Sequence, residues 1–489
     1  MTNENDGLEK KEKKVLSENN KTFLDDKELI KKEESILKAE KDLISKKETL
    51  LKEEKDIIEK RESLLEKSEE YVKEGEEYLK KMGPGIITGA ADDDPSGIAT
   101  YSQAGAQFGT SLLWIAAWVY PLVANIQEMC ARIALVTGRG LASNIKRNFS
   151  KEVLYVCTFL LFIANTLNIG ADLGAMAKTI QLVSPKISFV FLVIFIGIAG
   201  LFLEIFVPYK KYARYLKWLA IAVFSYVITG LIIHMDWSQL FHDGFIPQIT
   251  FSKTQILLVT GLLGTTISPY LFFWQTSEEI EEEISEGKTS IKARKGTNHK
   301  EIKEMRLDIW MGMLVTTTVM FFIIAVCANT LFVNGITNIE TAADAAKALQ
   351  PLAGQFAYVL FAIGILGTGL LAIPVLAGST AYAISESFGW REGLYRKFKT
   401  AHAFYGVIII SIIVGIIINF IGIDPIKALI YSAIANGIVA PVILVFIMKI
   451  SSSQKIMGEY KNKPITRTLG WIATVLMSIT AIAAIISLF

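Results

Sequence analysis

The chain has 489 residues, of which 52% are hydrophobic and 20% are charged, and its formal net charge is +2. Because Lys and Glu dominate the first eighty or so residues, the rest of the chain is strongly apolar, which predicts a polytopic, all-α membrane protein whose surroundings are the lipid bilayer. This charge distribution gives no indication of a nucleic-acid partner, and no catalytic motif indicates an enzyme.

The first predicted element is a long, charged, amphipathic helix within residues 1–82. Adjacent apolar pairs recur every seven residues from Leu29/Ile30 to Tyr78/Leu79, and the residues between them are mostly Lys, Glu, Asp and Ser. A strict seven-residue period is typical of a left-handed coiled coil, although a good seam has its apolar residues three and four apart. Two interpretations of residues 29–79 therefore stay open: self-association or partner binding, and a solvated charged helix.

Residues 83–489 are predicted to form an eleven-span domain, because eleven segments have about 20 or more largely apolar residues. The N-terminus lacks the apolar core of a cleavable signal peptide, so we expect the first span to direct membrane insertion. The predicted spans are 84–107, 110–137, 152–181, 187–207, 214–234, 254–276, 308–333, 352–386, 401–420, 425–449 and 468–488.

Alternate connections between these spans are rich in Lys and Arg, which predicts that they are cytoplasmic. One of them is a long charged loop at 277–306. This pattern places the N-terminal helix in the cytoplasm and the C-terminal Phe489 outside. The expected location of the protein is the bacterial plasma membrane. The three cysteines lie in apolar stretches without paired spacing and are expected to be free and buried; they are Cys130, Cys157 and Cys327.

Two short polar segments interrupt otherwise apolar helices, at 92–97 (DDDPSG) and 265–270 (TTISPY). They lie in spans one and six, so each opens one half of five spans. An odd number of spans per half gives the halves opposite orientations, which is the inverted-repeat design of many secondary transporters. In that design the two broken helices place the substrate site at the membrane midplane.

Every candidate ligand at the two interruptions is an oxygen atom. Three adjacent carboxylates inside a span are costly unless they face a cation or water, so a multiply charged cation is the expected cargo. Oxygen ligands favour Mg²⁺, Ca²⁺ and Mn²⁺, whereas sulfur and imidazole favour softer metals. The second interruption carries no charge and could instead be a simple proline kink. The predicted metal-site residues are Asp92, Asp93, Asp94, Ser96, Gly97, Thr265, Thr266, Ser268 and Tyr270.

Residues 83–138 resemble the start of the Nramp family of divalent-metal transporters. The motifs that carry the resemblance are Gly83-Pro84-Gly85, Asp94-Pro95-Ser96-Gly97, 103–109 (QAGAQFG), Leu112-Leu113-Trp114, Ala131-Arg132 and Thr137-Gly138. The resemblance implies the LeuT-type fold, with two inverted five-helix repeats and, here, an eleventh helix. The family has an Asp-Pro-Gly-Asn motif in helix one and a Met-Pro-His motif in helix six.

At several positions of these motifs, this chain has a neutral or oxygen-bearing residue in place of the family's residue. The family Asp falls on Asp94, but the sulfur ligand Met falls on a hydroxyl, and this loss weakens the preference for transition metals. The pattern resembles the magnesium-transporting branch related to Nramp, which implies transport of mainly Mg²⁺ and also Mn²⁺. The family Asn, Met, two His and carbonyl-bearing Ala fall respectively on Gly97, Ser268, Tyr270, Gln275 and Thr265.

The resemblance also implies transport without proton coupling. The family's acidic residues in helix three fall on Asn168 and Ala171, and residues 405–420 in span nine contain no Arg. Asp172 is a candidate proton carrier or a packing residue. Asn436 is expected either to contact the ion path or to pack helices, and Gln103 is expected to line the path.

The expected function is import of divalent metal ions by alternating access, with the metal as cargo and without a resident cofactor. Three alternatives stay open. The chain could be a proton-coupled Mn²⁺/Fe²⁺ transporter. It could be a sodium-coupled amine or amino-acid carrier of the same fold, since broken helices also bind organic substrates. It could also be a metal sensor that binds without flux and signals through its tail.

Overall fold

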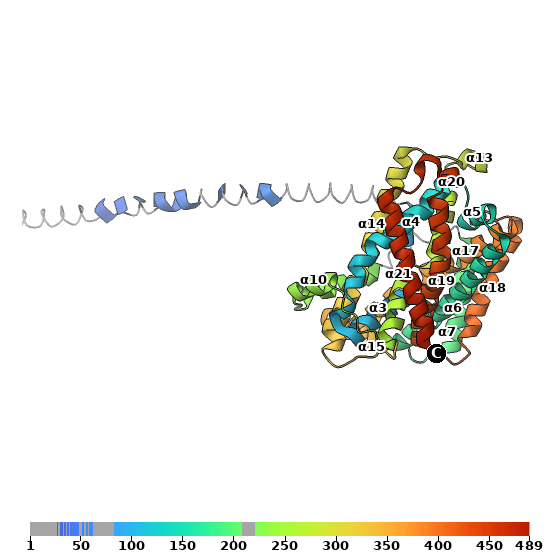
Figure 1. The fold of residues 1–489 in the computed structure, drawn as a ribbon. Coiled ribbons are helices and arrows are strands. Elements are labelled where there is room, and N and C mark those ends of the chain that lie inside the picture. Colours follow the sequence, from blue (N-terminus) through green and yellow to red (C-terminus); the bar gives the residue numbers. More distant parts are fainter. Residues whose placement is uncertain are drawn as a thin grey trace, which may run out of the picture. The chain divides into compact units, whose positions relative to one another are not determined.

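The computed structural model describes residues 83–207 and 221–488, together with residues 27, 30–32, 34, 35, 37, 38, 40–47, 51, 52, 55, 56 and 58–61 near the N-terminus. The chain divides into two units, Met1–Lys81 and Met82–Phe489. The described residues of the first unit are helical (Figure 1), and their apolar side chains are exposed, from 50% for Ile58 to 70% for Leu43. Part of the predicted heptad helix, including everything from residue 62 to 82, lies outside the described residues, and its role stays a prediction.

The second unit is built from helices, and its described residues include no strand (Figure 1). The elements of its first half are α2 (Pro84–Asp92), α3 (Pro95–Phe108), η1 (Gly109–Leu112), α4 (Trp114–Thr137), α5 (Leu141–Asn148), α6 (Lys151–Val183), α7 (Phe189–Phe206), η2 (Ile221–Phe224), α9 (Ser225–Ile232) and α10 (Trp237–Phe245).

The second half begins with another interrupted helix. Its elements are α11 (Lys253–Thr266), α12 (Pro269–Ser285), α13 (Ile291–Arg294), α14 (His299–Cys327), the π-helical η3 (Ala328–Phe332), α15 (Ala342–Lys347), α16 (Gln350–Ala353), η4 (Gly354–Phe356), α17 (Ala357–Phe388), η5 (Phe398–Thr400), α18 (His402–Ile418), α19 (Pro425–Ser451), α20 (Gln454–Met457), η6 (Gly458–Tyr460) and α21 (Pro464–Leu488).

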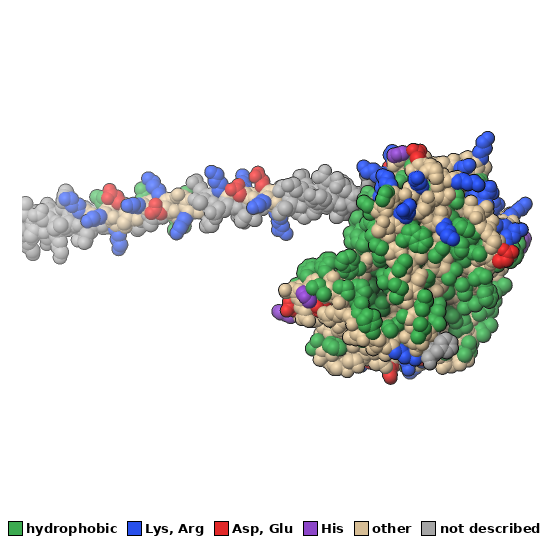
Figure 2. Space-filling model, in the orientation of Figure 1, with side chains coloured by type: hydrophobic (Ala, Val, Ile, Leu, Met, Phe, Trp, Pro, Cys, Tyr) green, Lys and Arg blue, Asp and Glu red, His purple; other side chains and the backbone are tan. Residues whose placement is uncertain are grey.

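Among the described residues, seven helices are long and apolar enough to cross a membrane, or eight when the pair Pro95–Leu112 and Trp114–Thr137, bent by 106°, counts as one span. Each of the eleven predicted segments contains at least one helix, although the start of segment 214–234 lies outside the described residues. On the face shown in Figure 2, hydrophobic side chains cover the middle of this unit, and Lys and Arg gather at the end that carries α5, α13 and α20 in Figure 1. We call this end the basic end; its cytoplasmic location stays a prediction.

The charged segment 277–306 differs from the expected loop. Residues up to Ser285 continue α12, α13 is a short helix, and α14 begins at His299 with Asn298 as its N-cap. Asn298 accepts hydrogen bonds from the backbone N–H groups of Lys300 and Glu301, and Glu301 completes a capping box. The segment is therefore largely helical, because its Glu-rich and Lys-rich stretches have high helix propensity and good caps.

The three cysteines are free and buried, as predicted.

A hydrogen-bond network joins α12 and α17 at the basic end. The Glu281 carboxylate accepts hydrogen bonds from the Tyr382 hydroxyl at 2.6 Å and from the backbone N–H groups of Leu394 and Tyr395 at 2.9 and 3.2 Å. These bonds hold the connection after α17 against α12, beside a cavity of about 430 Å³ that Glu386 and Glu392 also line.

Glu392, in that connection, should make stability depend on pH. Burial, and secondly the charge of Glu386, raise the pKa of Glu392 from 4.5 to about 9. A raised carboxyl pKa means that the folded protein binds more protons than the unfolded chain between about pH 4.5 and pH 9, so stability falls as the pH rises through this window. Glu392→Gln should remove this loss and raise the melting temperature at pH 8.5 by about 1–3 °C, with little change at pH 5.

Thermal unfolding of both proteins at the two pH values checks this expectation. Glu459→Gln, at an exposed glutamate in η6, is the matched control and should leave the pH profile unchanged. Equal pH profiles for the wild type and Glu392→Gln would contradict the assignment.

Candidate metal-binding site

The first interruption forms because the backbone signals at Asp93 to Pro95 end one helix and begin another. α2 ends at Asp92, and α3 begins at Pro95, whose fixed φ suits the first turn of a helix. Asp94 is the N-cap of α3, since its side chain accepts a hydrogen bond from the Gly97 N–H. The carboxylate of Asp94 therefore lies at the start of a helix, at the point where the span is broken.

The Asp94 carboxylate is fully buried and held from two sides. Its Oδ1 accepts hydrogen bonds from the Ser96 hydroxyl and the Gly97 N–H, both at 2.7 Å. Its Oδ2 accepts a hydrogen bond from the Asn168 side-chain amide of α6 at 2.8 Å, and the Asn168 amide oxygen accepts one from Ser432 of α19 at 2.6 Å. These donors stabilise a charged carboxylate, and the remaining lone pairs of its oxygens are available to a cation.

The second interruption repeats this design without a charge. α11 ends at Thr266, and α12 begins at Pro269, with Ser268 in the N-cap position. The Ser268 side chain does not cap α12; its hydroxyl donates to the carbonyl groups of Gly264, at 2.9 Å, and Thr265. The Ser268 oxygen keeps its lone pairs, so it can still act as a ligand to a metal ion.

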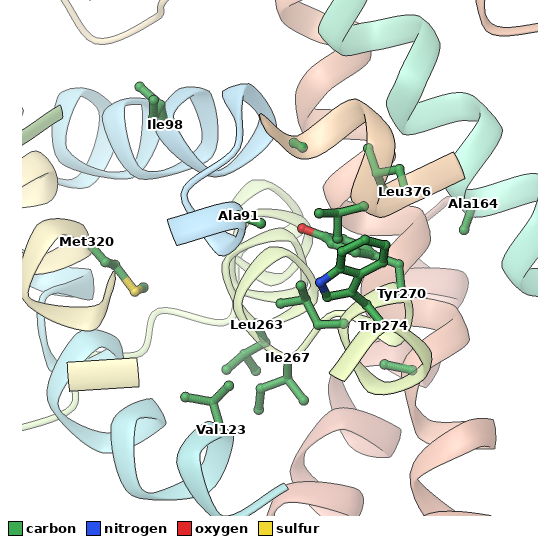
Figure 3. Packing of buried hydrophobic residues seen from close by; sticks show 14 of the residues in the cluster. Ala91, Ile98, Val123, Ala164, Leu263, Ile267, Tyr270, Trp274, Met320 and Leu376 are labelled. Atoms are coloured by element: carbon green, nitrogen blue, oxygen red, sulfur yellow. The ribbon is translucent and has the colours of Figure 1, made fainter. Parts of the chain in front are cut away.

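The two interruptions meet in the interior of the unit. The hydroxyls of Ser96 and Thr265 lie 3.4 Å apart, and those of Tyr101 and Thr266 lie 3.2 Å apart. Figure 3 shows the buried residues around this place, among them Ala91 of α2, and Ile267 and Tyr270 at the α11–α12 interruption. The Tyr270 hydroxyl is buried and has no hydrogen-bond partner among the described residues.

Gly97 has a steric role at this meeting point. A Cβ added to Gly97 would lie 3.3 Å from the Thr265 hydroxyl oxygen and 3.3 Å from the Asp92 carbonyl oxygen. A side chain here would therefore crowd the place where α3 meets α11. The glycine keeps the polar groups of the two interruptions close together.

The three adjacent aspartates do not converge. Whereas Asp94 faces α6, the carboxylates of Asp92 and Asp93 lie at the Thr316 hydroxyl of α14, at 3.2 and 2.8 Å. In the parts of the chain that the structure describes, no three His, Cys, Asp or Glu side chains group closely enough to hold a metal ion. A cation at Asp94 would therefore combine one carboxylate with hydroxyl, carbonyl or water oxygens.

The structure brings only some of the other predicted residues to this site. Asn168 contacts Asp94 directly, and Asp172 lies one turn further along α6 with both carboxylate oxygens buried and without a hydrogen bond among the described residues. Asn436 lies one turn beyond Ser432 on α19, and both polar atoms of its buried side chain lack hydrogen-bond partners there. These three residues remain candidates for the ion path.

Two predicted path residues have other partners. Gln103 accepts a hydrogen bond from the Ile339 N–H at 2.8 Å and donates to the Thr337 carbonyl at 3.3 Å, so it holds the connection after η3. Gln275 donates to Glu279, one turn along α12. Neither residue contacts Asp94.

Sequence reasoning missed two polar residues at the interruptions, Ser432 and Thr316. The signal for Thr316 is a run of three threonines, 316–318, inside an apolar span. The signal for Ser432 is its position four residues before Asn436, which places both side chains on one face of α19. Neither signal specifies which helix the side chain would contact.

Comparison with known proteins decides the family. The model of the family described as natural resistance-associated macrophage protein-like, or Nramp, matches residues 85–487. The chain belongs to the Nramp family. It is a multi-pass membrane transporter of the divalent-metal Nramp type and not an enzyme, as the sequence predicted.

Two similar relatives of this Nramp chain are bacterial proteins named divalent metal cation transporter MntH. The one from Caldanaerobacter subterraneus subsp. tengcongensis is 26% identical over 398 residues, covering 80% of this chain and 89% of that protein. The one from Clostridium acetobutylicum is 24% identical over 420 residues, covering 80% and 87%.

The same fold is found in a solved structure. The manganese transporter of Eremococcus coleocola, in a complex with an aromatic bis-isothiourea compound, superimposes with a TM-score of 0.67. The match has 16% sequence identity and covers 83% of this chain and 86% of the other. The all-helical, LeuT-type architecture predicted from the sequence is thereby confirmed.

Proposed function

We propose that this Nramp-family chain imports Mg²⁺, and also Mn²⁺, across the bacterial plasma membrane by alternating access and without proton coupling. The observation that carries the proposal is the donor set at the two interruptions. Asp94, Ser96, Thr265, Thr266, Ser268 and Tyr270 offer one carboxylate and five hydroxyl oxygens, with no sulfur or imidazole. Such a set suits a hard cation.

The single carboxylate at this place supports a partly hydrated ion. Mg²⁺ loses its water reluctantly and is usually bound through one or two carboxylates while it keeps several waters. The hydroxyls of Ser96 and Thr265 can accept hydrogen bonds from such waters. Mn²⁺, which also accepts oxygen ligands, would use the same position.

The surroundings of Asp94 support uncoupled transport. Its partner on α6 is the neutral Asn168, whose amide donates to the carboxylate and cannot carry a proton away. Residues 405–420, which include most of α18, contain no Arg, Lys or His. Among the described residues, no acidic side chain forms a hydrogen bond with Asp94 through which it could take up the Asp94 proton directly.

Proton-coupled Mn²⁺ transport is the second candidate function. The buried Asp172, with both oxygens unbonded among the described residues, favours it, because such a carboxyl group is well suited to hold a proton. The names of the relatives, which include a manganese transporter, also agree with it.

Uptake into proteoliposomes tests the proposal. Vesicles that contain a Mg²⁺-sensitive dye and a pH-sensitive dye should show Mg²⁺ influx with no change of internal pH, whether or not a pH gradient is imposed. Mn²⁺ influx with acidification, and no Mg²⁺ influx, would instead establish the proton-coupled alternative. A Na⁺ requirement and competition by amines would support an organic-cation carrier, and binding without flux would support a sensor.

Ser268→Met should change the selectivity of this site. The substitution places a thioether at the second interruption, and sulfur favours Mn²⁺ over Mg²⁺. We expect the ratio of Mn²⁺ to Mg²⁺ uptake to rise about tenfold, which corresponds to about 1.4 kcal/mol. Competition between the two ions in proteoliposomes measures the ratio. Ser268→Ala, which removes the hydroxyl without adding sulfur, is the control, and an unchanged ratio in Ser268→Met would exclude position 268 from the ion's ligands.

A further inference from the structure

We propose that Asp92, Asp93 and Thr316 form a second position for a divalent cation, separate from the one at Asp94. All three side chains are buried, with Asp92 fully inaccessible and Asp93 only 6% exposed. The Thr316 hydroxyl lies 2.8 Å from Asp93 Oδ1 and 3.2 Å from Asp92 Oδ2. Two carboxylates from α2 and its C-terminal cap thus meet one hydroxyl from α14.

Close packing of α2 on α14 creates this meeting point. The Asp308 carboxylate accepts hydrogen bonds from the backbone N–H groups of Gly83 and Gly85 at 3.1 and 2.7 Å, which ties the start of α2 to α14. Further along, a Cβ added to Gly89 would lie 2.6 Å from the Gly312 carbonyl oxygen, so the two backbones touch there. The residues of the proposed position lie about one turn beyond that contact: Asp92 and Asp93 follow Gly89, and Thr316 follows Gly312 on α14.

The hydrogen bonds at this position do not satisfy the two carboxylates. A hydroxyl has one proton, so Thr316 can donate to only one of the two carboxylates at a time. Asp92 Oδ1 is buried and has no hydrogen-bond partner among the described residues. No Lys, Arg or His forms an ion pair with Asp92 or Asp93 in the described part of the chain. Two buried carboxylates without a compensating charge are strongly unfavourable.

A divalent cation supplies what is missing. It would neutralise both carboxylates, use the free Asp92 oxygen and accept the Thr316 oxygen as a further ligand. The C-terminus of α2 also favours a cation at this position, because the last carbonyl groups of a helix lack intrahelical donors and carry the negative end of the helix dipole. All of these groups are hard oxygen donors, so the ion belongs to the class of Mg²⁺ and Mn²⁺.

The second position is distinct from the first because its carboxylates face a different helix. Asp94 is held by α3 and α6, whereas Asp92 and Asp93 are held by α14. The identity of the ion rests on the proposed function, since the second position would take the same class of metal as the transport site. A test by binding stoichiometry separates the two proposals, because it does not depend on transport.

Equilibrium dialysis of the purified full-length protein against Mn²⁺, with the bound metal measured by mass spectrometry, gives the number of ions per chain. We expect two for the wild type, one for Asp94→Asn, and one for the double variant Asp92→Asn/Asp93→Asn. Thr316→Val should weaken one of the two sites at least tenfold. Thr317→Val is the matched control and should bind like the wild type, since the Thr317 hydroxyl donates to carbonyl groups of its own helix and, among the described residues, to no other group.

Size-exclusion profiles and melting temperatures identify variants that fail to fold, and Thr316→Val tests the position without changing a charge. A single Mn²⁺ in the wild type that Asp94→Asn abolishes would overturn the second position and leave the proposed function intact. Two bound ions together with no uptake of either metal would support the second position and overturn the proposed function. Unchanged affinities in Thr316→Val would remove Thr316 from the ligand set and overturn the assignment.

Discussion

Replacing Asp94 with asparagine should abolish metal uptake. The substitution removes the one negative charge that the two interruptions share at the proposed ion position and nearly preserves the side-chain shape. We expect Mg²⁺ and Mn²⁺ uptake to fall about 100-fold or more, which corresponds to at least about 2.7 kcal/mol of lost stabilisation. The asparagine oxygen can still accept from Ser96 and Gly97, so the break between α2 and α3 should persist.

Dye-based uptake in proteoliposomes, with the amount of incorporated protein measured, checks this result. Asp236→Asn is the matched control, because Asp236 is an exposed N-cap of α10 and asparagine caps a helix as well as aspartate does. The control should transport within twofold of the wild type. Uptake by Asp94→Asn above one tenth of the wild-type rate would show that the ion does not depend on this carboxylate.

Gly264→Val should have the largest effect on stability. Gly264 lies on α11 one turn before Ser268, where α11 packs directly on α19. A Cβ at Gly264 would lie 2.6 Å from the Gly437 Cα and would also collide with the Ala433 carbonyl group. Since both obstacles are backbone atoms, relief requires the two helices to separate. We expect a loss of about 3 kcal/mol or more, at the upper end of overpacking costs.

Separation of α11 from α19 should also displace the second interruption, so residual folded protein should transport poorly. Detergent-solubilised protein followed by size-exclusion chromatography after heating gives the apparent melting temperature. Gly406→Val, on α18, is the control because a Cβ there meets no atom within 4 Å. A melting temperature for Gly264→Val equal to that of the control would contradict the close contact between α11 and α19.

The positions of both interruptions could be predicted from the sequence because their causes are local. Pro95 and Pro269 each stand at the first position of a helix, and Asp94 is a strong N-cap, so local residues mark each break. Proline alone does not break a span, since α4, α17 and α19 each continue through an internal proline. The chemistry of the ligands followed from residue types alone. Helices within most apolar segments were predictable for a similar reason, since a span of about 20 apolar residues in lipid must satisfy its backbone internally.

The directions of the side chains could not be predicted in the same way. Asp92, Asp93 and Asp94 are adjacent, yet the first two contact Thr316 and the third contacts Asn168, which is 74 residues away. The sequence predicts that Gln103 lines the ion path, whereas in the structure its side chain accepts a hydrogen bond from the Ile339 N–H in the connection after η3. A buried polar group takes whichever partner the packing of helices brings near, and no local pattern specifies that partner.

The sequence by itself therefore determined that this is a helical membrane transporter with two broken spans lined by oxygen atoms, because composition, helix caps and prolines act over one or two turns. Only the tertiary structure decided which aspartate contacts α6 and which two lie against α14. The physical reason is that these directions follow from contacts between distant helices. The touching backbones of Gly89 and Gly312 and the amide bridge from Asn168 to Asp94 are examples.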